Sequence, residues 1–489
     1  MDTMLREILE TGEGPKYRRI VDGLEAAILD GTLTPGDKLP PVRDLAWRLG
    51  VTPGTVARAF TILGEAGRVT SEVGRGTFVA DRAGLPLRAG LPLRAGQGAG
   101  RAPGRRAPSA ASQELAPLTN PDLSNEGDVL FAPRLPDLGQ IALVREGLTL
   151  AAAQPVENLL GYPTFPSHSA LREAVMPWLP EDMQSAVEPA HVVMTNGGQN
   201  AILIALQALL LDAPPVVLVV AQSYPGVQRA AELLHARVVP VPMDADGVLP
   251  DALDAVAAAE GAQIFFTMPE AHNPTATVTA PERRFAVAEV ARRHGLHLLQ
   301  DDCYRLGAPS GPSYRALLPE LGWYISSLSK AITPALRVGY AVAPRSMPAR
   351  LRRVVDTNFF GLSRPVSDTA AYVLAHPDTP GLVAAMRDHM RAHVETAVNL
   401  LGRFDLGWDP GVPFLWLRLP EGWREASFVQ ALEADGIRVR PGEDFATRDA
   451  RRDHAVRISV NGQMSPAHFH GVIERIAHRL DHPPERAEA

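Results

Sequence analysis

Cysteine is almost absent from this chain of 489 residues, as are long apolar runs. The single cysteine, Cys303, excludes an intrachain disulfide and fits a reducing compartment. A zinc site would need histidine and carboxylate ligands instead, and the sequence shows no such cluster. No apolar run approaches the roughly 18 residues of a membrane span, and the first residues lack the apolar segment of a signal peptide. We therefore expect a soluble, cytoplasmic protein with no metal site and no membrane partner.

The composition is that of an ordinary globular protein, but its charge is unevenly distributed. A hydrophobic content of 46% supports a sizeable core, and the length suggests about three domains of roughly 150 residues each. Residues 1–113 hold 16 Lys and Arg against 12 Asp and Glu, whereas the remainder carries a net charge of −11. The first region can approach phosphates and the acidic body would not. Because residues 1–80 alone have a net charge of −1, charge supports nucleic-acid binding only weakly.

A segment between these regions cannot build a core. Residues 82–113 contain six Arg, no acid, and mostly Gly, Pro, Ala and Ser elsewhere, including a tandem Gly-Leu-Pro-Leu-Arg-Ala hexapeptide. This composition predicts a flexible linker, which we set at 82–118. Its arginines could contact DNA, but solvated linker charge is the favoured interpretation.

Residues 1–81 show the pattern of three short helices followed by a hairpin. Apolar residues at helical spacing are Ile20, Val21, Leu24, Ala27 and Ile28, then Leu45 and Leu49, then Val56, Phe60 and Leu63. Gly31 and Gly50 are natural helix stops, and Thr52-Pro53 is a natural start. Two strand-like runs then flank Gly74-Arg75-Gly76. The pattern predicts a winged helix-turn-helix.

Several side chains of this unit are candidates for reading DNA. The residues expected to face the groove are Arg43, Thr52, Thr55, Arg58 and Ala59, with Arg75 on the wing suited to the minor groove. A helix N-terminus next to Thr52 can hold phosphate. The alternative is a small packed domain whose arginines form a solvated face.

The motifs of this stretch are specific in order and spacing. An LP-x-x-R segment, a V-T-x-x-T-V-x-R-A-F helix and a G-x-G-T-F-V wing occur together, so that roughly residues 15–81 resemble the GntR family of regulators. The resemblance implies that DNA is contacted at Arg43, Thr52, Thr55, Arg58 and Gly76. It also implies binding as a pair to half-sites roughly 34 Å apart, and hence a homodimer.

After the linker, strand-like apolar runs alternate with helical segments. The strand-like runs are HVVMT, VVLVV, QIFFTM, LHLLQ, YISSL and GYAVA. This alternation predicts an α/β body at 119–480 with a mainly parallel sheet. We expect a large subdomain at about 160–350, a small α+β subdomain from about 351, and a tail at 481–489.

Four motifs of the body follow predicted strands, where ligands bind in parallel sheets. Lys330 comes after one strand and Asp301 ends another. Asn273-Pro274 follows a third, and the glycine-rich turn Gly197-Gly198-Gln199 joins a fourth to a helix. Taken singly, each has an ordinary alternative: a surface lysine, a capping aspartate or a generic turn.

Taken jointly, in this order, the motifs resemble the fold-type I, class I/II aminotransferases, and the resemblance runs from about residue 119 to 480. It implies that pyridoxal 5′-phosphate (PLP) forms an aldimine with Lys330. The implied cofactor-binding residues are Gly197, Gly198, Gln199, Tyr224, Asn273, Asp301, Tyr304, Ser327, Ser329, Lys330 and Arg337, with Tyr162 reaching across from the partner subunit.

Within that set the resemblance implies separate roles. Asp301 would pair with the ring nitrogen, Tyr224 would stack on the ring, and Asn273 and Tyr304 would bind the ring oxygen. Gly198, Gln199, Ser327 and Arg337 would bind the phosphate. Arg457 would bind a ligand carboxylate, unless it is solvated. Pro163, Ser167 and Ala276 stand where the family usually has glycine.

A GntR-type reader fused to an aminotransferase-like body resembles the MocR subfamily of regulators. This resemblance implies a transcriptional regulator in which an amine or amino acid exchanges with Lys330 on the cofactor and changes how the paired readers sit on DNA. Free PLP is an alternative effector. The rival function is a working aminotransferase with an accessory DNA-binding segment.

Overall fold

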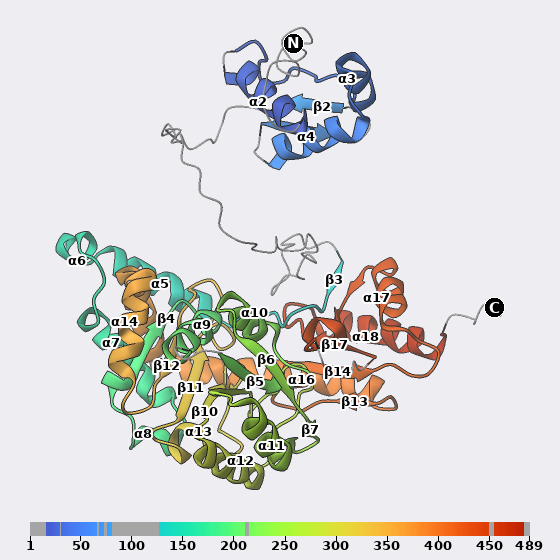
Figure 1. Ribbon diagram of the computed structural model, residues 1–489. Helices are drawn as coiled ribbons and strands as arrows, with labels where there is room; N and C mark the ends of the chain where they lie inside the picture. The colour runs from blue at the N-terminus through green and yellow to red at the C-terminus, as the bar shows by residue number, and fades with distance from the viewer. Residues whose placement is uncertain are drawn as a thin grey trace, which may run out of the picture. The chain divides into compact units, whose positions relative to one another are not determined.

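The computed structural model describes residues 16–29, 31–65, 68–72, 76–80, 127–210, 215–448 and 454–483. The chain divides into two compact units, Met1–Pro108 and Ser109–Ala489 (Figure 1). The predicted linker and Arg75 lie outside the described residues, so the domain boundaries stay predictions. In the described part of the chain, no helix is both long and apolar enough to cross a membrane.

The N-terminal unit is the expected winged helix-turn-helix. Its elements are α2 (Lys16–Leu29), α3 (Val42–Leu49), α4 (Pro53–Glu65), β1 (Val69–Glu72) and β2 (Gly76–Val79). The two strands pair antiparallel, with Val69 opposite Val79 and Glu72 opposite Gly76. Helix α3 stops at Gly50, whose φ of 61° suits a residue without a side chain.

The core of this unit contains the predicted apolar residues and one that was misassigned. Ala59 was expected to face the groove, but it is fully buried. Positions 56, 59, 60 and 63 form one stripe at helical spacing, so residue 59 falls on the core side of α4. The prediction for Ala59 is therefore wrong.

The larger unit is built on a seven-stranded sheet in the order β4-β12-β11-β10-β9-β5-β6. Its strands are β4 (Val192–Thr195), β12 (Gly339–Val342), β11 (Gly322–Ser327), β10 (His297–Asp301), β9 (Ile264–Thr267), β5 (Val216–Val220) and β6 (Arg237–Val241). Only β12 is antiparallel to its neighbours, so the expected mainly parallel sheet is confirmed. Strand β6 was not predicted; it contains Pro240, which an edge position tolerates.

Helices cover both faces of this sheet (Figure 1). One face packs against α9 (Gly198–Leu209), α10 (Pro225–Leu233) and α14 (Pro348–Phe359). The other packs against α11 (Pro250–Glu260), α12 (Pro281–His294) and α13 (Tyr314–Leu317). Beside β4 lie α5 (Gln140–Ala152), α7 (Ser169–Val175) and α15 (Arg364–Ala375), and two short helices complete this part, α6 (Val156–Leu160) and α8 (Glu181–Gln184).

A smaller sheet in the order β13-β14-β17-β16 forms the second core of the unit. Its strands are β13 (Leu406–Gly407), β14 (Phe414–Arg418), β17 (Ala455–Ser459) and β16 (Arg440–Pro441), and its helices are α16 (Thr379–Leu401), α17 (Glu425–Ala434) and α18 (Pro466–Asp481). Two short pairs complete the unit, β3 (Asp128–Val129) with β15 (Ile437–Arg438), and β7 (Met243–Asp244) with β8 (Gly247–Val248). The predicted boundary near residue 351 falls inside α14, whose Leu351 and Val355 pack in the core of the large sheet.

Candidate cofactor site and DNA interface

Residues far apart in the sequence meet at one cavity of about 520 Å³ in the larger unit. The predicted residues that line it are Gly198, Gln199, Tyr224, Asn273, Asp301, Tyr304, Ser327, Ser329, Lys330, Arg337 and Arg457. Most of them follow the carboxyl ends of parallel strands, which meet at the same edge of the sheet. A larger cavity of about 1010 Å³, lined by Gln222 and Trp408 among others, holds none of the predicted residues and so does not share this chemistry.

Backbone and a guanidinium group come close together at one end of the cavity. Helix α9 begins at Gly198, after Gly197 with a φ of 84°. A Cβ on Gly197 would lie 2.6 Å from a terminal nitrogen of Arg337, and one on Gly198 would lie 2.5 Å from the Cys303 Sγ. Only glycine permits this approach, which leaves the free N–H groups of the first helical turn next to a cation. That arrangement is suited to a phosphate.

Lys330 and Asp301 lie at the carboxyl ends of two neighbouring strands, β11 and β10. The Lys330 Nζ is 5.3 Å from the centre of the Tyr304 ring. Asp301 is buried, and its carboxylate accepts a hydrogen bond from the Cys303 backbone N–H at 3.0 Å. Burial raises the pKa of the Asp301 carboxyl, so a cationic ligand atom beside it would stabilise its ionised form.

Arg457 is a fixed, buried cation rather than a solvated one. It is 2% exposed, because β17 lies between β14 and β16. Its guanidinium donates to the Asn273 side-chain oxygen at 2.6 Å and to the Phe131 carbonyl at 2.9 Å. Burial lowers the pKa of Arg457 to about 10, which still leaves the group charged at neutral pH. The solvated alternative for this residue is therefore wrong.

Tyr224 and Gln199 are held together beside the cavity. The Gln199 amide donates to the Gly226 carbonyl at 2.9 Å. A Cβ on Gly226 would lie 2.0 Å from the Gln199 side-chain oxygen and 2.2 Å from the Tyr224 ring, so both side chains pack against bare backbone. Burial raises the pKa of the Tyr224 hydroxyl, and the ring stays neutral and available for stacking.

Two predicted residues do not line the cavity. Gly197 caps α9 and contacts Arg337 instead. Tyr162 is 81% exposed, and its ring lies 5.4 Å from that of Phe360. Its role was predicted for a partner subunit, so it stays a prediction. Ala276, which replaces a glycine of the family pattern, takes a φ of 60° that glycine adopts more easily.

Sequence reasoning missed two polar residues of the cavity wall. Cys303 is half-buried beside Gly198, and desolvation raises the pKa of its thiol, so the residue packs as a small apolar group. Arg440 is also buried, stands opposite Arg457 in the sheet, and donates to Asp444 at 2.9 Å. The available signal was a charged residue inside a short strand, which is too common to single out Arg440.

The N-terminal unit presents part of the predicted DNA interface on α4. Thr52 and Arg58 are exposed and Thr55 is half-buried, with the two threonine hydroxyls 2.9 Å apart. The Arg58 guanidinium lies over the Tyr17 ring, 4.1 Å from its centre, which limits its freedom while leaving it exposed. Arg43 belongs to α3.

Beside the wing lies a lysine that the sequence did not indicate. Gly76 begins β2 with a φ of 120°, and a Cβ there would lie 2.8 Å from the Lys38 side chain. Lys38 is exposed and lies 5.7 Å from the centre of the Phe78 ring.

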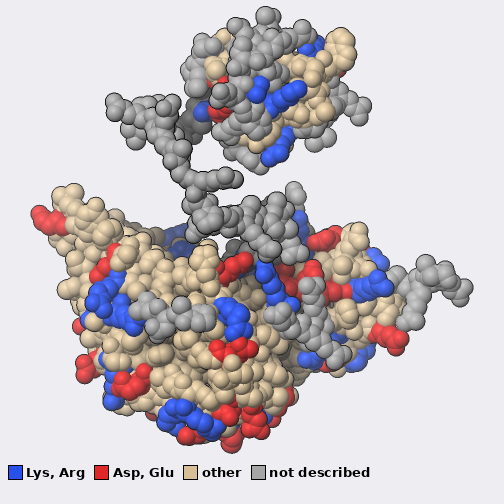
Figure 2. Space-filling view, in the orientation of Figure 1, with Lys and Arg blue, Asp and Glu red and all other residues tan. Residues whose placement is uncertain are grey.

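In Figure 2 the visible face of the larger unit shows acidic and basic groups side by side, with no broad patch of one sign.

Known protein families match both units of the chain. The model of aminotransferase class I and II matches residues 140–476, and that of bacterial regulatory proteins, gntR family, matches residues 16–79. An uncharacterized HTH-type transcriptional regulator, YdeF of Bacillus subtilis, is 25% identical over 92% of this chain and 91% of its own. The probable rhizopine catabolism regulatory protein MocR of Rhizobium meliloti is 28% identical over 70% of this chain and 68% of its own.

A solved structure supports the fold of the larger unit. The crystal structure of an archaeal alanine:glyoxylate aminotransferase superposes with a TM-score of 0.65 at 22% identity, over 73% of this chain and 91% of that one. At this identity the likeness concerns the fold alone.

Proposed function

Because this chain belongs to the aminotransferase class I and II family and carries a gntR-type unit before that part, we propose that it is a PLP-dependent transcriptional regulator sensing an amine or amino acid. The observation that carries the proposal is the presence, in one chain, of a winged helix-turn-helix and a cavity that joins Lys330, Asp301 and Arg337. An enzyme of metabolism has no need of the first, and a simple DNA reader has no need of the second. Since such a regulator acts on DNA, we expect it in the cytoplasm.

The cavity fits PLP by the chemistry of its walls. The glycine cradle at Gly197 and Gly198, with Arg337 beside it, suits a phosphate dianion. The buried Asp301 carboxylate suits a protonated ring nitrogen, and the Lys330 amine suits a carbonyl carbon. When bound, PLP supplies an aldehyde that condenses reversibly with primary amines. The chain's own task is to hold the ring between Tyr224, Asn273 and Tyr304.

Arg457 gives the site a means of selecting its effector. A carboxylate next to the reacting amine would pair with this guanidinium, which its contacts with Asn273 and Phe131 already hold in place. A preorganised buried cation loses little entropy on binding, so amino acids are favoured over simple amines. Free PLP as effector would need no such residue.

We expect a homodimer, as paired half-sites on DNA require. Exposed apolar side chains lie close together in the sequence around α6, namely Val156, Leu159, Leu160 and Tyr162. Exposed apolar groups of this kind are typical of protein contacts. A second subunit covering them would bring Tyr162 towards the partner's cofactor.

The test measures two responses of the protein to each added amino acid. The full chain, loaded with PLP, is titrated with amino acids while its visible absorbance and its affinity for a DNA fragment from upstream of its own gene are measured. We expect an amino acid that changes the absorbance to change the DNA affinity as well, and Lys330→Ala to abolish both responses. If the absorbance changes, keto acid accumulates over many turnovers and DNA binding is unaffected, the protein is an aminotransferase instead.

A further inference from the structure

One buried arginine outside the cavity holds the loop that carries Asn273. Arg284 lies in α12 and is fully buried. Its Nε donates to the Thr279 carbonyl at 3.1 Å, and a terminal nitrogen donates to the Pro269 carbonyl at 3.2 Å. Residues 269 and 279 are the two ends of one loop, which a backbone hydrogen bond of 2.8 Å from Thr279 to Pro269 also closes. A single guanidinium therefore spans both ends of this loop.

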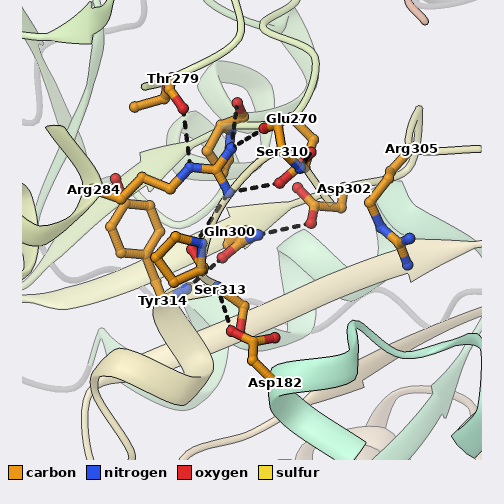
Figure 3. Close-up of polar contacts among 12 residues, drawn as sticks. Asp182, Glu270, Thr279, Arg284, Gln300, Asp302, Arg305, Ser310, Ser313 and Tyr314 are labelled. Atoms are coloured by element: carbon orange, nitrogen blue, oxygen red, sulfur yellow. Dashed lines mark hydrogen bonds and ion pairs between the residues drawn. The ribbon is translucent and has the colours of Figure 1, made fainter. Parts of the chain in front are cut away.

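The remaining donors of Arg284 bind Glu270 of this loop and a second segment, at 310–312 (Figure 3). One nitrogen donates to the Glu270 carboxylate at 2.6 Å and to the Pro312 carbonyl at 3.4 Å. The other donates to the Ser310 hydroxyl at 2.6 Å, and the Ser310 N–H in turn donates to Glu270 at 2.9 Å. The side chain thus makes five hydrogen bonds, which uses every N–H that a guanidinium carries. A group saturated in this way has one geometry available to it.

The loop transmits this geometry to the cavity. Asn273, near its centre, is buried and accepts the 2.6 Å hydrogen bond from Arg457. Within the loop, the His272 ring bonds to the Thr275 hydroxyl at 2.7 Å, and that hydroxyl to the Thr277 hydroxyl at 2.9 Å, so the loop has little internal freedom. A displacement of its ends would therefore move Asn273, which is a hydrogen-bond partner of Arg457.

We propose that Arg284 is a positioning residue, which holds Asn273 against the cofactor and, through Asn273, aims Arg457 at the carboxylate of the effector. The proposal rests on the proposed function, since it assumes PLP on Lys330. It predicts that loss of the Arg284 contacts changes the chemistry of a site that Arg284 does not touch.

The chain offers a matched control at the preceding position. Arg283 lies in the same helix and also makes several hydrogen bonds, to Asp244 at 3.1 Å and to the Gly247 and Val248 carbonyls at 3.2 and 2.9 Å. Those partners belong to the β7–β8 hairpin and not to the loop from 269 to 279. Arg283→Met therefore removes a comparable set of bonds without releasing the loop.

The experiment compares full-chain Arg284→Met, Arg284→Lys and Arg283→Met, each loaded with PLP. The first readout is the pH titration of the visible absorbance of the Lys330-linked cofactor. As a donor to the ring oxygen, Asn273 favours the deprotonated form of the Lys330-linked cofactor. We therefore expect Arg284→Met to raise the midpoint of the pH titration by roughly one unit, which is a tenfold change in the proton affinity. Arg284→Lys should give an intermediate shift, and Arg283→Met none.

The second readout compares glycine with methylamine, which differ by the carboxylate. We expect Arg284→Met to lower the preference for glycine about tenfold, as the loss of one directed hydrogen bond would. If wild type shows no preference for glycine, the assignment of Arg457 fails. The pH titration still tests whether Arg284 positions Asn273. If wild type shows no absorbance from linked PLP, the proposed function fails instead.

An equal shift in Arg284→Met and Arg283→Met, or no shift in a folded Arg284→Met, would overturn the proposal. Should Arg284→Met not fold, Ser310→Ala takes its place, because it removes one of the five bonds from an exposed loop position. We expect a smaller shift in the same direction, and its absence would also refute the positioning role.

Discussion

Several cations of the two units lie in opposite surroundings. In the N-terminal unit, Lys38 and Arg58 are exposed and lie over aromatic rings. In the larger unit, Arg284, Arg440 and Arg457 are at most 2% exposed and are hydrogen-bonded to fixed partners. Exposed cations exchange counterions for phosphates and bind in a salt-dependent way. Buried cations keep one direction and suit the choice of a small ligand.

The largest effect should come from the covalent residue of the buried site. Lys330→Ala removes the amine that links PLP, so we expect complete loss of the visible absorbance of the linked cofactor. DNA affinity without effector should stay within about twofold, because the reading surface belongs to the other unit. Lys38→Ala is the reverse control, since it should weaken DNA binding and leave the absorbance unchanged. Retention of the absorbance in Lys330→Ala would contradict the assignment of Lys330.

A buried carboxyl should make the stability of the larger unit depend on pH. Burial, and then the charge of Glu270, raise the pKa of Asp302 to about 8, although Gln300 donates to this carboxyl at 2.7 Å. The folded state therefore binds a proton that the unfolded state releases near pH 4, so stability falls as the pH rises from about 4 to about 8. Asp302→Asn has no such proton.

We expect the stability of Asp302→Asn relative to wild type to rise across this pH range by several kcal/mol, since one pKa unit is worth about 1.4 kcal/mol. Urea unfolding at several pH values, followed by tryptophan fluorescence, measures the difference. Since five of the six tryptophans lie beyond residue 108, the signal reports mainly the larger unit. A difference that does not change with pH would mean that Asp302 is ionised in the folded protein.

The contribution of Arg457 should appear in ligand choice. Arg457→Ala removes a charge-assisted pair worth about 2–3 kcal/mol, so the preference for glycine over methylamine should fall roughly 30- to 150-fold. Arg418→Ala, on the neighbouring strand β14 and paired with Asp405 at the surface, is the control and should leave the preference intact. An unchanged preference in Arg457→Ala would assign the carboxylate to Arg440 or to no arginine.

The smallest effect should be found at the exposed site. Arg58→Ala should weaken DNA binding by about 1–2 kcal/mol, less than loss of a fully free contact, because stacking on Tyr17 already restrains the side chain. The slope of affinity against salt should also become shallower if Arg58 contacts phosphate. Arg68→Ala, whose partner is Glu25, serves as control, and equal effects of both variants would count against the α4 interface.

Much of this could be predicted because the information is local. The three helices of the reader, the Gly50 stop and the hairpin follow from spacing and turn residues within about 65 positions. Ala59 shows where such reasoning fails. A change of one position along α4 moves a residue from the exposed face to the buried face, and an alanine is equally acceptable on either face. Strand β6 was missed because its proline and half-buried pattern resemble a loop.

In the larger unit, the order of motifs was enough to name Lys330, Asp301 and Asn273, since Asp301 ends β10 and the other two lie in the segments that follow β11 and β9. Their convergence on one cavity is a property of the parallel sheet, whose carboxyl ends meet at one edge. What no spacing could reveal was Arg440 opposite Arg457, Cys303 packed under Gly198, or the loop held by Arg284. These pairs are separated by up to about a hundred residues and have no common pattern.

By itself, the sequence determined the kind of elements, the class of fold and the residue types of the cofactor site, because helix spacing, turn chemistry and short motifs act over a few residues. Only the tertiary structure decided which cations are buried, which partners hold them and which loop Arg284 secures. The physical reason is that burial and hydrogen-bond direction depend on elements brought together from distant parts of the chain, and the cost of burying a charge is set by all of them at once.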